Sequence, residues 1–238
     1  MSGHSKWANI KRKKEKTDAV RGKSFTKIGR EIAVAVKEGG PDPNNNARLR
    51  EVIAKAKANN MPNDNIMRGI KKASGELGSI NYEDIQYEGY GTGGIAVIVK
   101  ALTDNRNRTA SDVRHIFDKF GGNLGTTGCV SYMFDNKGII TLDNNGIDED
   151  EISMLVLDLG AEDIDYDEEI ITVYTDPTQI TAVSEGLTSA GYTLADASVG
   201  FVPQNTMSLD DEAMVKFEKM LDMLEENDDV QDVWHNLG

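Results

Sequence analysis

The sequence is poor in cysteine and has no long apolar run. Cys129 is the single cysteine among 238 residues, which excludes an intrachain disulfide and a two-cysteine metal or redox motif and fits a reducing compartment. We expect it to be a small buried strand residue. No apolar run approaches the ~20 residues that span a bilayer, and no apolar segment follows the basic N-terminus as a signal peptide requires. We therefore expect a cytoplasmic protein that binds no membrane.

Signals of catalysis are also missing. Residues 22–24 imitate the end of a phosphate-binding loop, but Thr17 stands in place of its first glycine and no strand precedes it. The glycine-rich residues 89–94 join two expected strands, which favours a hairpin turn over a dinucleotide loop. The three histidines are isolated in sequence, without metal-ligand spacing. We expect no enzyme, no metal site and no cofactor.

Charge is divided unevenly along the chain. The formal net charge is -14, yet residues 1–72 hold 18 Lys and Arg against 7 Asp and Glu, a net +11. The remainder holds 8 against 33, a net -25. Such asymmetry suggests a basic module that faces nucleic acid, joined to an acidic body. The acidic runs at 148–151, 167–169 and 225–229 are expected to be solvated surface, or else to face a basic protein such as a ribosomal protein.

Three short amphipathic helices are expected in the basic segment. Apolar residues recur at helical spacing from Phe25 to Val36, and this helix ends at residues 39–41. Its cations should lie on the opposite face, solvated and available. Two further helices follow the asparagine run at 44–46 and Pro62. Together they predict a small basic helical domain.

The pattern changes to α/β from residue 82. Two strands joined by a hairpin are expected at 82–90 and 95–101, then a helix around 113–120 and a strand at 129–134. A six-element unit follows in the order βαββαβ, which is ferredoxin-like. Its expected elements are a strand at 138–142, a helix at 148–159, strands at 162–167 and 170–175, a helix at 178–190 and a strand at 192–202.

The C-terminal tail is expected to close the earlier α/β unit. Ser208 and Asp211 suggest a capped helix, followed by a short strand at 230–234. Packing on the six-element unit is the alternative, but the earlier unit would then have one helix to cover its sheet. The predicted class is α+β, an N-terminal three-helix domain plus two ferredoxin-like α/β domains, one inserted within the other. The predicted domains are 1–77, 80–135 plus 206–238, and the insertion at 136–205.

Seven short motifs lie in the first 135 residues, at positions 3–11, 21–23, 39–43, 59–62, 87–91, 103–109 and 121–125. They resemble signatures of one family, the YebC/PmpR-type proteins, which include the mitochondrial translational activator of cytochrome c oxidase. The resemblance implies a helical N-terminal domain, two α/β domains and a probable transcriptional regulator, although some members are ribosome-associated translation factors. Val20, Thr92 and Cys129 depart from the usual pattern.

The basic N-terminal stretch is the candidate nucleic-acid site. Cations that neutralise phosphates give strongly salt-dependent, largely sequence-independent binding, and the alternative is that these charges only aid solubility. Trp7 could stack on a base or anchor the segment to its own domain. The candidate residues are Lys6, Trp7, Lys11, Arg12, Lys13, Lys14, Lys16, Arg21, Lys23, Lys27 and Arg30.

A second anion site is predicted at Arg106, Arg108 and Arg114. The first two precede a helix for which Thr109 and Asp112 are the expected capping pair, and helix N-termini attract anions. Pairing of these arginines with acidic neighbours is the alternative.

Two binding functions are consistent with the sequence. One is a transcriptional regulator that docks on promoter DNA, and the other is a translation factor that docks on rRNA or tRNA while its acidic domains meet ribosomal proteins. No recognition helix with base-reading side chains can be placed. The oligomeric state cannot be inferred from the sequence.

Overall fold

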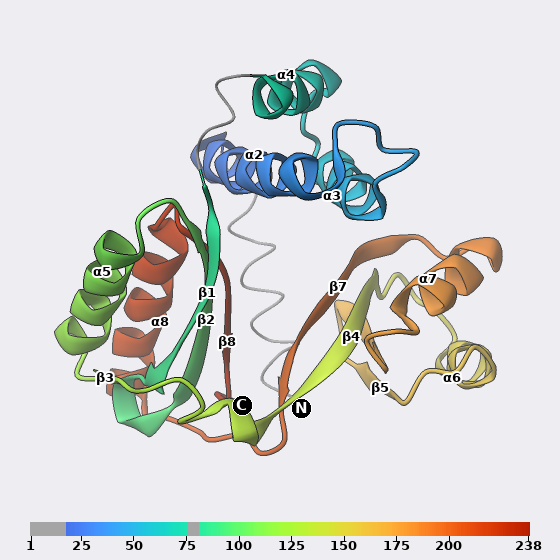
Figure 1. Cartoon of the computed structure of the whole chain (residues 1–238). Coiled ribbons are helices and arrows are strands. Elements are labelled where there is room, and N and C mark those ends of the chain that lie inside the picture. Colours follow the sequence, from blue (N-terminus) through green and yellow to red (C-terminus); the bar gives the residue numbers. More distant parts are fainter. Residues whose placement is uncertain (1–17, 76–80) are drawn as a thin grey trace. The chain divides into compact units, whose positions relative to one another are not determined.

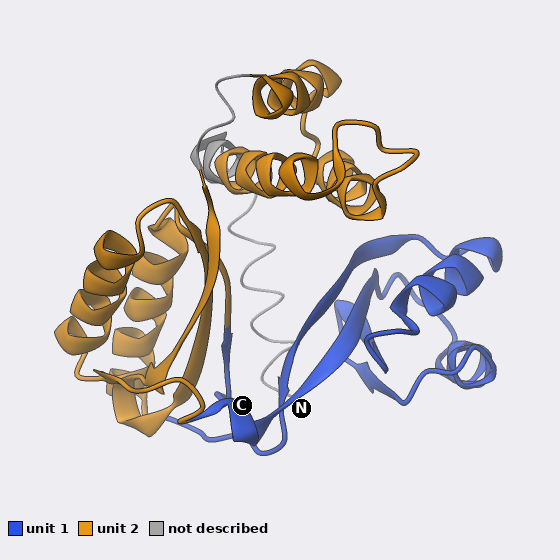
Figure 2. Cartoon of the chain, viewed as in Figure 1, with its two compact units in different colours: residues 1–13, 130–209, 234–238 blue, residues 14–129, 210–233 orange. Residues whose placement is uncertain are grey.

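The computed structural model describes residues 18–75 and 81–238, with side chains from residue 24 onward. It contains a helical region and two four-stranded sheets (Figure 1), which confirms the predicted α+β class. The chain forms two compact units (Figure 2). One unit contains residues 130–209 and 234–238. The other contains the described residues up to 129 together with residues 210–233. The three predicted domain boundaries stay a prediction.

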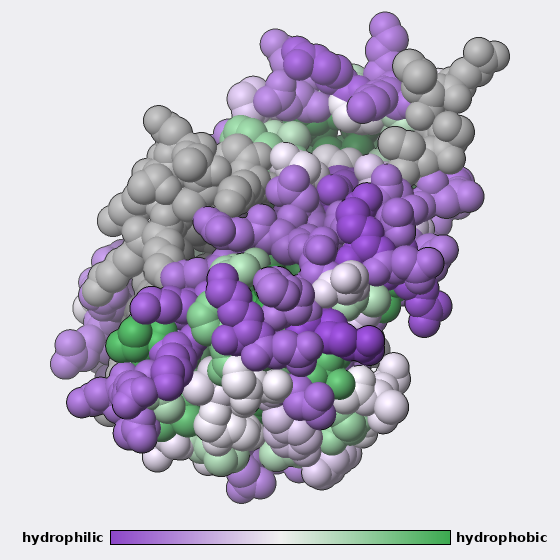
Figure 3. All heavy atoms as spheres, turned by 90° about the vertical axis from the view of Figure 1, so that its left-hand side faces the viewer, coloured by the Kyte–Doolittle hydropathy of each residue, from purple (hydrophilic) through white to green (hydrophobic). Residues whose placement is uncertain are grey.

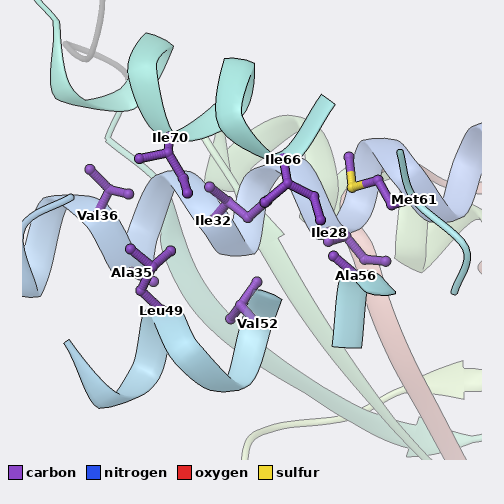
Figure 4. Close-up of a cluster of buried hydrophobic side chains, with 10 residues drawn as sticks. All are labelled: Ile28, Ile32, Ala35, Val36, Leu49, Val52, Ala56, Met61, Ile66 and Ile70. Atoms are coloured by element: carbon purple, nitrogen blue, oxygen red, sulfur yellow. The ribbon is translucent and has the colours of Figure 1, made fainter. Parts of the chain in front are cut away.

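The helical region consists of α2 (Asp18–Gly39), α3 (Ala47–Ala58) and α4 (Asn63–Ser74). The predicted stripe of α2 is confirmed, because Ile28, Ile32 and Val36 are buried against α3 and α4 (Figure 4). Asn46 caps α3, since its side-chain oxygen accepts a hydrogen bond from the Leu49 backbone N at 2.9 Å. A small apolar core thus fixes which faces of α2 and α4 point away from it.

The first sheet has the strand order β3-β1-β2-β8. Helices α5 (Arg106–Lys119) and α8 (Asp211–Glu226) cover one face of it (Figure 1). Because α8 and β8 come from the C-terminal tail, the predicted insertion is confirmed. A 3-10 turn at Thr92–Gly94 joins β1 and β2, and Gly93 and Gly94 have φ values of 69° and 83°, so the hairpin is also confirmed. The strands are β1 (Glu83–Tyr90), β2 (Ala96–Thr103), β3 (Asn123–Leu124) and β8 (Val230–His235).

The strand predicted at 129–134 is wrong. Residues 131–133 form a 3-10 turn, Cys129 lies half-buried in a bend, and the sheet gains its strand at β3 instead. Gly89 explains this pairing, because a Cβ there would lie 2.4 Å from the Asn123 carbonyl oxygen. Only glycine lets β3 approach β1 so closely. The glycine at position 89 is therefore explained by the close packing of the two backbones.

The second sheet is built from the inserted chain and confirms the ferredoxin-like βαββαβ order. Its spatial order is β5-β6-β4-β7, with α6 and α7 on one face (Figure 1). The buried side chains of β4, β6, α6 and α7 form its core. The elements are β4 (Phe134–Asp143), α6 (Glu149–Asp158), β5 (Asp163–Tyr166), β6 (Ile170–Thr175), α7 (Ile180–Ser189) and β7 (Leu194–Pro203).

The start of α8 differs from the prediction. Asp210 is its cap, since the side-chain oxygen accepts a hydrogen bond from the Ala213 backbone N at 2.8 Å. Ser208 therefore lies before the helix rather than at its start. Within the described ranges 18–75 and 81–238, no helix has both the length and the apolar character needed to cross a bilayer.

Candidate nucleic-acid interface

Most of the predicted N-terminal site lies outside the described residues. Arg21 and Lys23 lie on the backbone of α2, but their side chains are outside the described part. Lys27 and Arg30 are therefore the members of the set whose contacts the structure describes. The members outside the described ranges altogether are Lys6, Trp7, Lys11, Arg12, Lys13, Lys14 and Lys16.

Lys27 and Arg30 point from α2 toward elements of the first sheet and its helices. Lys27 Nζ donates to the Glu225 carbonyl oxygen of α8 at 3.0 Å. Arg30 Nη1 donates to the Leu102 carbonyl oxygen of β2 at 3.1 Å and forms an ion pair with Asp229. The Arg30 side chain is 16% exposed. The expectation that this face of α2 stays solvated is therefore wrong at Arg30, which the chain itself engages.

Asp229 is the acceptor at the centre of this contact. Besides Arg30, its carboxylate accepts hydrogen bonds from Arg108 Nη2 at 2.8 Å, Thr109 Oγ1 at 2.6 Å and Thr103 Oγ1 at 3.2 Å. Its side chain is only 4% exposed. Burial alone would raise the pKa of Asp229, but the hydrogen bonds from Thr109, Arg108 and Arg30 lower that pKa to about 2. One buried, charged carboxylate thus joins α2, β2 and α5.

The predicted second anion site does not converge. Helix α5 begins at Arg106 with Asn105 as its cap, so the expected Thr109 and Asp112 capping pair is wrong and Thr109 is buried one turn inside. At about 100° per residue, Arg106 and Arg108 lie about 160° apart around the helix axis. Arg106 and Arg108 therefore do not share one face of this helix, and the second anion site stays a prediction.

Arg108 already has acidic partners. It forms ion pairs with Asp229 and, at 2.7 Å, with Asp104. These hydrogen bonds raise the pKa of Arg108. Arg106 and Arg114 are exposed. The described contacts of Arg108 therefore follow the alternative interpretation, in which loop and helix arginines pair with neighbouring acids.

Exposed cations gather on α4, a surface that was not among the candidate residues. Arg68, Lys71 and Lys72 are all exposed and lie within an arc of about 100° around the helix. Ile66 and Ile70 are buried on the other side. Hydrophilic residues cover the top of Figure 3, where Figure 1 places α4. We call Arg68, Lys71 and Lys72 the α4 cation face.

Two cations on α3, Lys55 and Arg48, differ from those of the α4 cation face because they have acidic partners. Lys55 Nζ lies 2.8 Å from Glu31 Oε1, and Arg48 pairs with Glu38 and Asp84. Among the residues with described side chains, no acid forms an ion pair with the α4 cation face. The spacing i, i+3, i+4 was the sequence signal for this face.

Comparisons with known proteins place the chain in a family. A model of the TACO1/YebC protein N-terminal domain matches residues 5–76, and one of the TACO1/YebC second and third domain matches residues 82–237. A probable transcriptional regulatory protein of Acetivibrio thermocellus is 60% identical over 238 residues, 99% of this chain and 98% of the relative. One from Thermoanaerobacter pseudethanolicus is 55% identical over 238 residues, 100% of this chain and 97% of that relative.

A solved structure supports the same relationship. The crystal structure of the conserved hypothetical protein Aq1575 from Aquifex aeolicus is 47% identical and superposes with a TM-score of 0.84. The match covers 93% of this chain and 91% of that one. The matches span both the helical region and the α/β part, which confirms the resemblance found in the motifs. The chain therefore belongs to the TACO1/YebC family, whose relatives are named probable transcriptional regulatory proteins.

Proposed function

We propose that this chain is a cytoplasmic, non-enzymatic regulator of gene expression that binds nucleic acid through its basic helical region, with DNA as the polymer. The names of its relatives support a transcriptional regulator. The observation that carries the proposal is the α4 cation face. Its three cations are exposed and lie beside one another, on a segment whose net charge is +11.

The proposed contacts are to phosphate. Lys and Arg side chains on one helix face can neutralise phosphates without reading bases, which gives affinity with little sequence preference. The N-terminal cations from Lys6 to Lys23 belong to the proposed set of phosphate-binding residues. Arg30 does not, because Asp229 engages it. The net -25 of residues 73–238 opposes close wrapping of DNA around the remainder of the chain.

The test is binding of the full chain to a fluorescent DNA duplex and to a single-stranded RNA of the same length, measured by anisotropy. Replacing Arg68, Lys71 and Lys72 of the α4 cation face by Ala should weaken binding by at least tenfold, on the order of 1.4 kcal/mol. The control replaces Lys216 and Lys219 of α8, two cations outside the helical region, by Ala and should leave the affinity unchanged. Equal losses in both variants, or no binding by the wild type at low salt, would reject the proposal.

A translation factor that binds rRNA or tRNA is the second candidate. The acidic residues that follow the helical region in the sequence favour this candidate. They would attract a basic protein, such as a ribosomal protein, and would repel a second stretch of phosphates. Crosslinking in cells, followed by sequencing of the bound nucleic acid, separates the two. Discrete genomic sites support the DNA regulator, and predominant rRNA or tRNA reads support the translation factor.

A further inference from the structure

Helix α6 exposes two large apolar side chains on one face. Met154 is 70% exposed and Leu157 is 61% exposed, whereas Ile152 and Val156 on the opposite side are fully buried. Single exposed apolar residues are common on protein surfaces. Here two of them stand three residues apart, so they are neighbours on the helix surface. The helix therefore presents a small apolar patch away from its own core.

Carboxylates surround this patch. Asp150 and Asp158 lie four residues before and after Met154, and Glu151 lies three residues before it. At about 100° per residue, all three are within about 60° of Met154 around the helix. All three are exposed. We call Met154 and Leu157 with Asp150, Glu151 and Asp158 the α6 face.

The surroundings of the α6 face are acidic as well. Residues 136–205 contain 15 Asp and Glu against one basic residue, Lys137, a net -14. That lysine forms an ion pair with Glu162, and α6 itself carries no Lys or Arg. A surface of this kind repels nucleic acid and anionic lipid, and it attracts a cationic partner.

We propose that the α6 face docks a Lys- and Arg-rich amphipathic helix of a partner protein. Apolar side chains of that helix cover Met154 and Leu157, while its cations meet Asp150, Glu151 and Asp158. A methionine suits such a role because its flexible, polarisable side chain adapts to different apolar partners. Recognition by apolar anchors spaced along a helix is a recurrent binding mode. This proposal is independent of which nucleic acid the helical region binds.

The docking is tested on the full chain carrying methyl-labelled methionine. The probe is a synthetic peptide of about 15 residues, made of Leu and Lys with the leucines on one helical face. NMR titration should move the Met154 methyl signal with saturation and leave the Met67 signal of α4 in place. A peptide of the same composition, with its leucines spread around the helix, is the control. It should bind at least tenfold more weakly.

Two variants locate the site. Leu157→Asn should weaken peptide binding about tenfold, and Val215→Asn on α8, also an exposed apolar position, should not change it. Asp150→Asn with Asp158→Asn should weaken binding and flatten its salt dependence, because both carboxylates lose their charge. Circular dichroism should show that each variant is folded. Leu157→Asn probes the apolar part of the α6 face, and the double Asn variant probes its charged part.

Several results would overturn the proposal. One is the absence of a saturable Met154 shift, and another is equal affinity for the control peptide, which would mean charge attraction alone. A Met154 signal that moves with protein concentration, without peptide, would make a second copy of the chain the occupant. A signal that moves when residues 1–17 are deleted would make the chain's own basic segment the occupant.

Discussion

The α2 and α4 helices both carry cations at helical spacing, but the chain uses them differently. On α2, Arg30 is 16% exposed and is held by Asp229 and the Leu102 carbonyl. On α4, Arg68, Lys71 and Lys72 are exposed and, among the described residues, have no acidic partner. The number of cations in a segment therefore does not give the number that are available to a phosphate. That number also depends on which cations are paired with acidic residues elsewhere in the chain.

The difference comes from one carboxylate that lies far away in sequence. Asp229 is 199 residues from Arg30 and 121 residues from Arg108. A buried ion pair is costly to break, because removing one partner leaves the other charge buried and unsatisfied. Removing a charge from the α4 cation face leaves no buried charge behind, since its three side chains are exposed. Stability should therefore depend on the α2 contact and binding on the α4 cation face.

The largest expected effect is on stability, from Asp229→Ala. Removing this carboxylate leaves Arg30 and Arg108 without their shared partner and removes one hydrogen-bond acceptor from the buried Thr109 hydroxyl. We expect the free energy of unfolding to fall by about 3–5 kcal/mol, measured by urea denaturation. Asp228→Ala is the matched control, because Asp228 is exposed, and its effect should stay within about 0.5 kcal/mol. Equal effects of the two variants would show that the Asp229 contact contributes little.

The next effect is a pH dependence. The folded-state pKa of Asp229 is lowered from 3.8 to about 2, so its contribution is complete above about pH 4 and is lost as the pH falls toward 2. We expect the difference in unfolding free energy between wild type and Asp229→Asn to shrink over that window by about 2 kcal/mol. Urea denaturation from pH 5 to 2 measures it. A difference that stays constant would mean that Asp229 has an ordinary pKa in the folded chain.

A smaller effect is expected from Arg30→Lys. Lysine keeps the charge, but its side chain is one atom shorter than the reach to Arg30 Nη1, the nitrogen that meets both the Leu102 carbonyl oxygen and the Asp229 carboxylate. The free energy of unfolding should fall by about 1–2 kcal/mol. Arg68→Lys on α4 is the control and should change it by less than about 0.5 kcal/mol. A larger loss for Arg68→Lys than for Arg30→Lys would contradict the claim that the Arg30 contact stabilises the fold more than Arg68 does.

The smallest effect on stability is expected from the triple change of Arg68, Lys71 and Lys72 to Ala. Lys71 and Lys72 lie in the last turn of α4, where cations stabilise the helix dipole slightly. Thermal and urea denaturation should therefore show a loss of about 1 kcal/mol or less. A loss as large as that of Asp229→Ala would indicate that these cations have buried partners.

Much of the fold was predictable because its patterns are local. The stripe of Ile28, Ile32 and Val36 fixes the core face of α2, and the alternation of helices and strands in the inserted chain fixes its ferredoxin-like order. Strand β3 was missed because two residues give no period. Its position depends on how closely Gly89 lets two backbones approach, and that is a tertiary property.

The candidate site was harder to predict than the fold. Asp229 ends an acidic run that was expected to be solvated, yet it is buried because its donors arrive from α2, β2 and α5. A local sequence pattern does not predict contacts between residues that are more than 100 positions apart in the sequence. The α4 cation face was visible as a spacing of three cations, but only the structure separates it from Arg48 and Lys55 of α3, which are paired with acids.

The salt dependence of DNA binding is the most direct test of the difference between Arg30 of α2 and the α4 cation face. Each phosphate contact on a duplex contributes about 0.9 to the slope of log K against log salt concentration. The triple Ala variant of the α4 cation face should lower that slope by about 2–3, whereas Arg30→Lys, measured under conditions where it is folded, should leave it unchanged. An unchanged slope in the triple variant, together with a reduced slope in Arg30→Lys, would contradict the account.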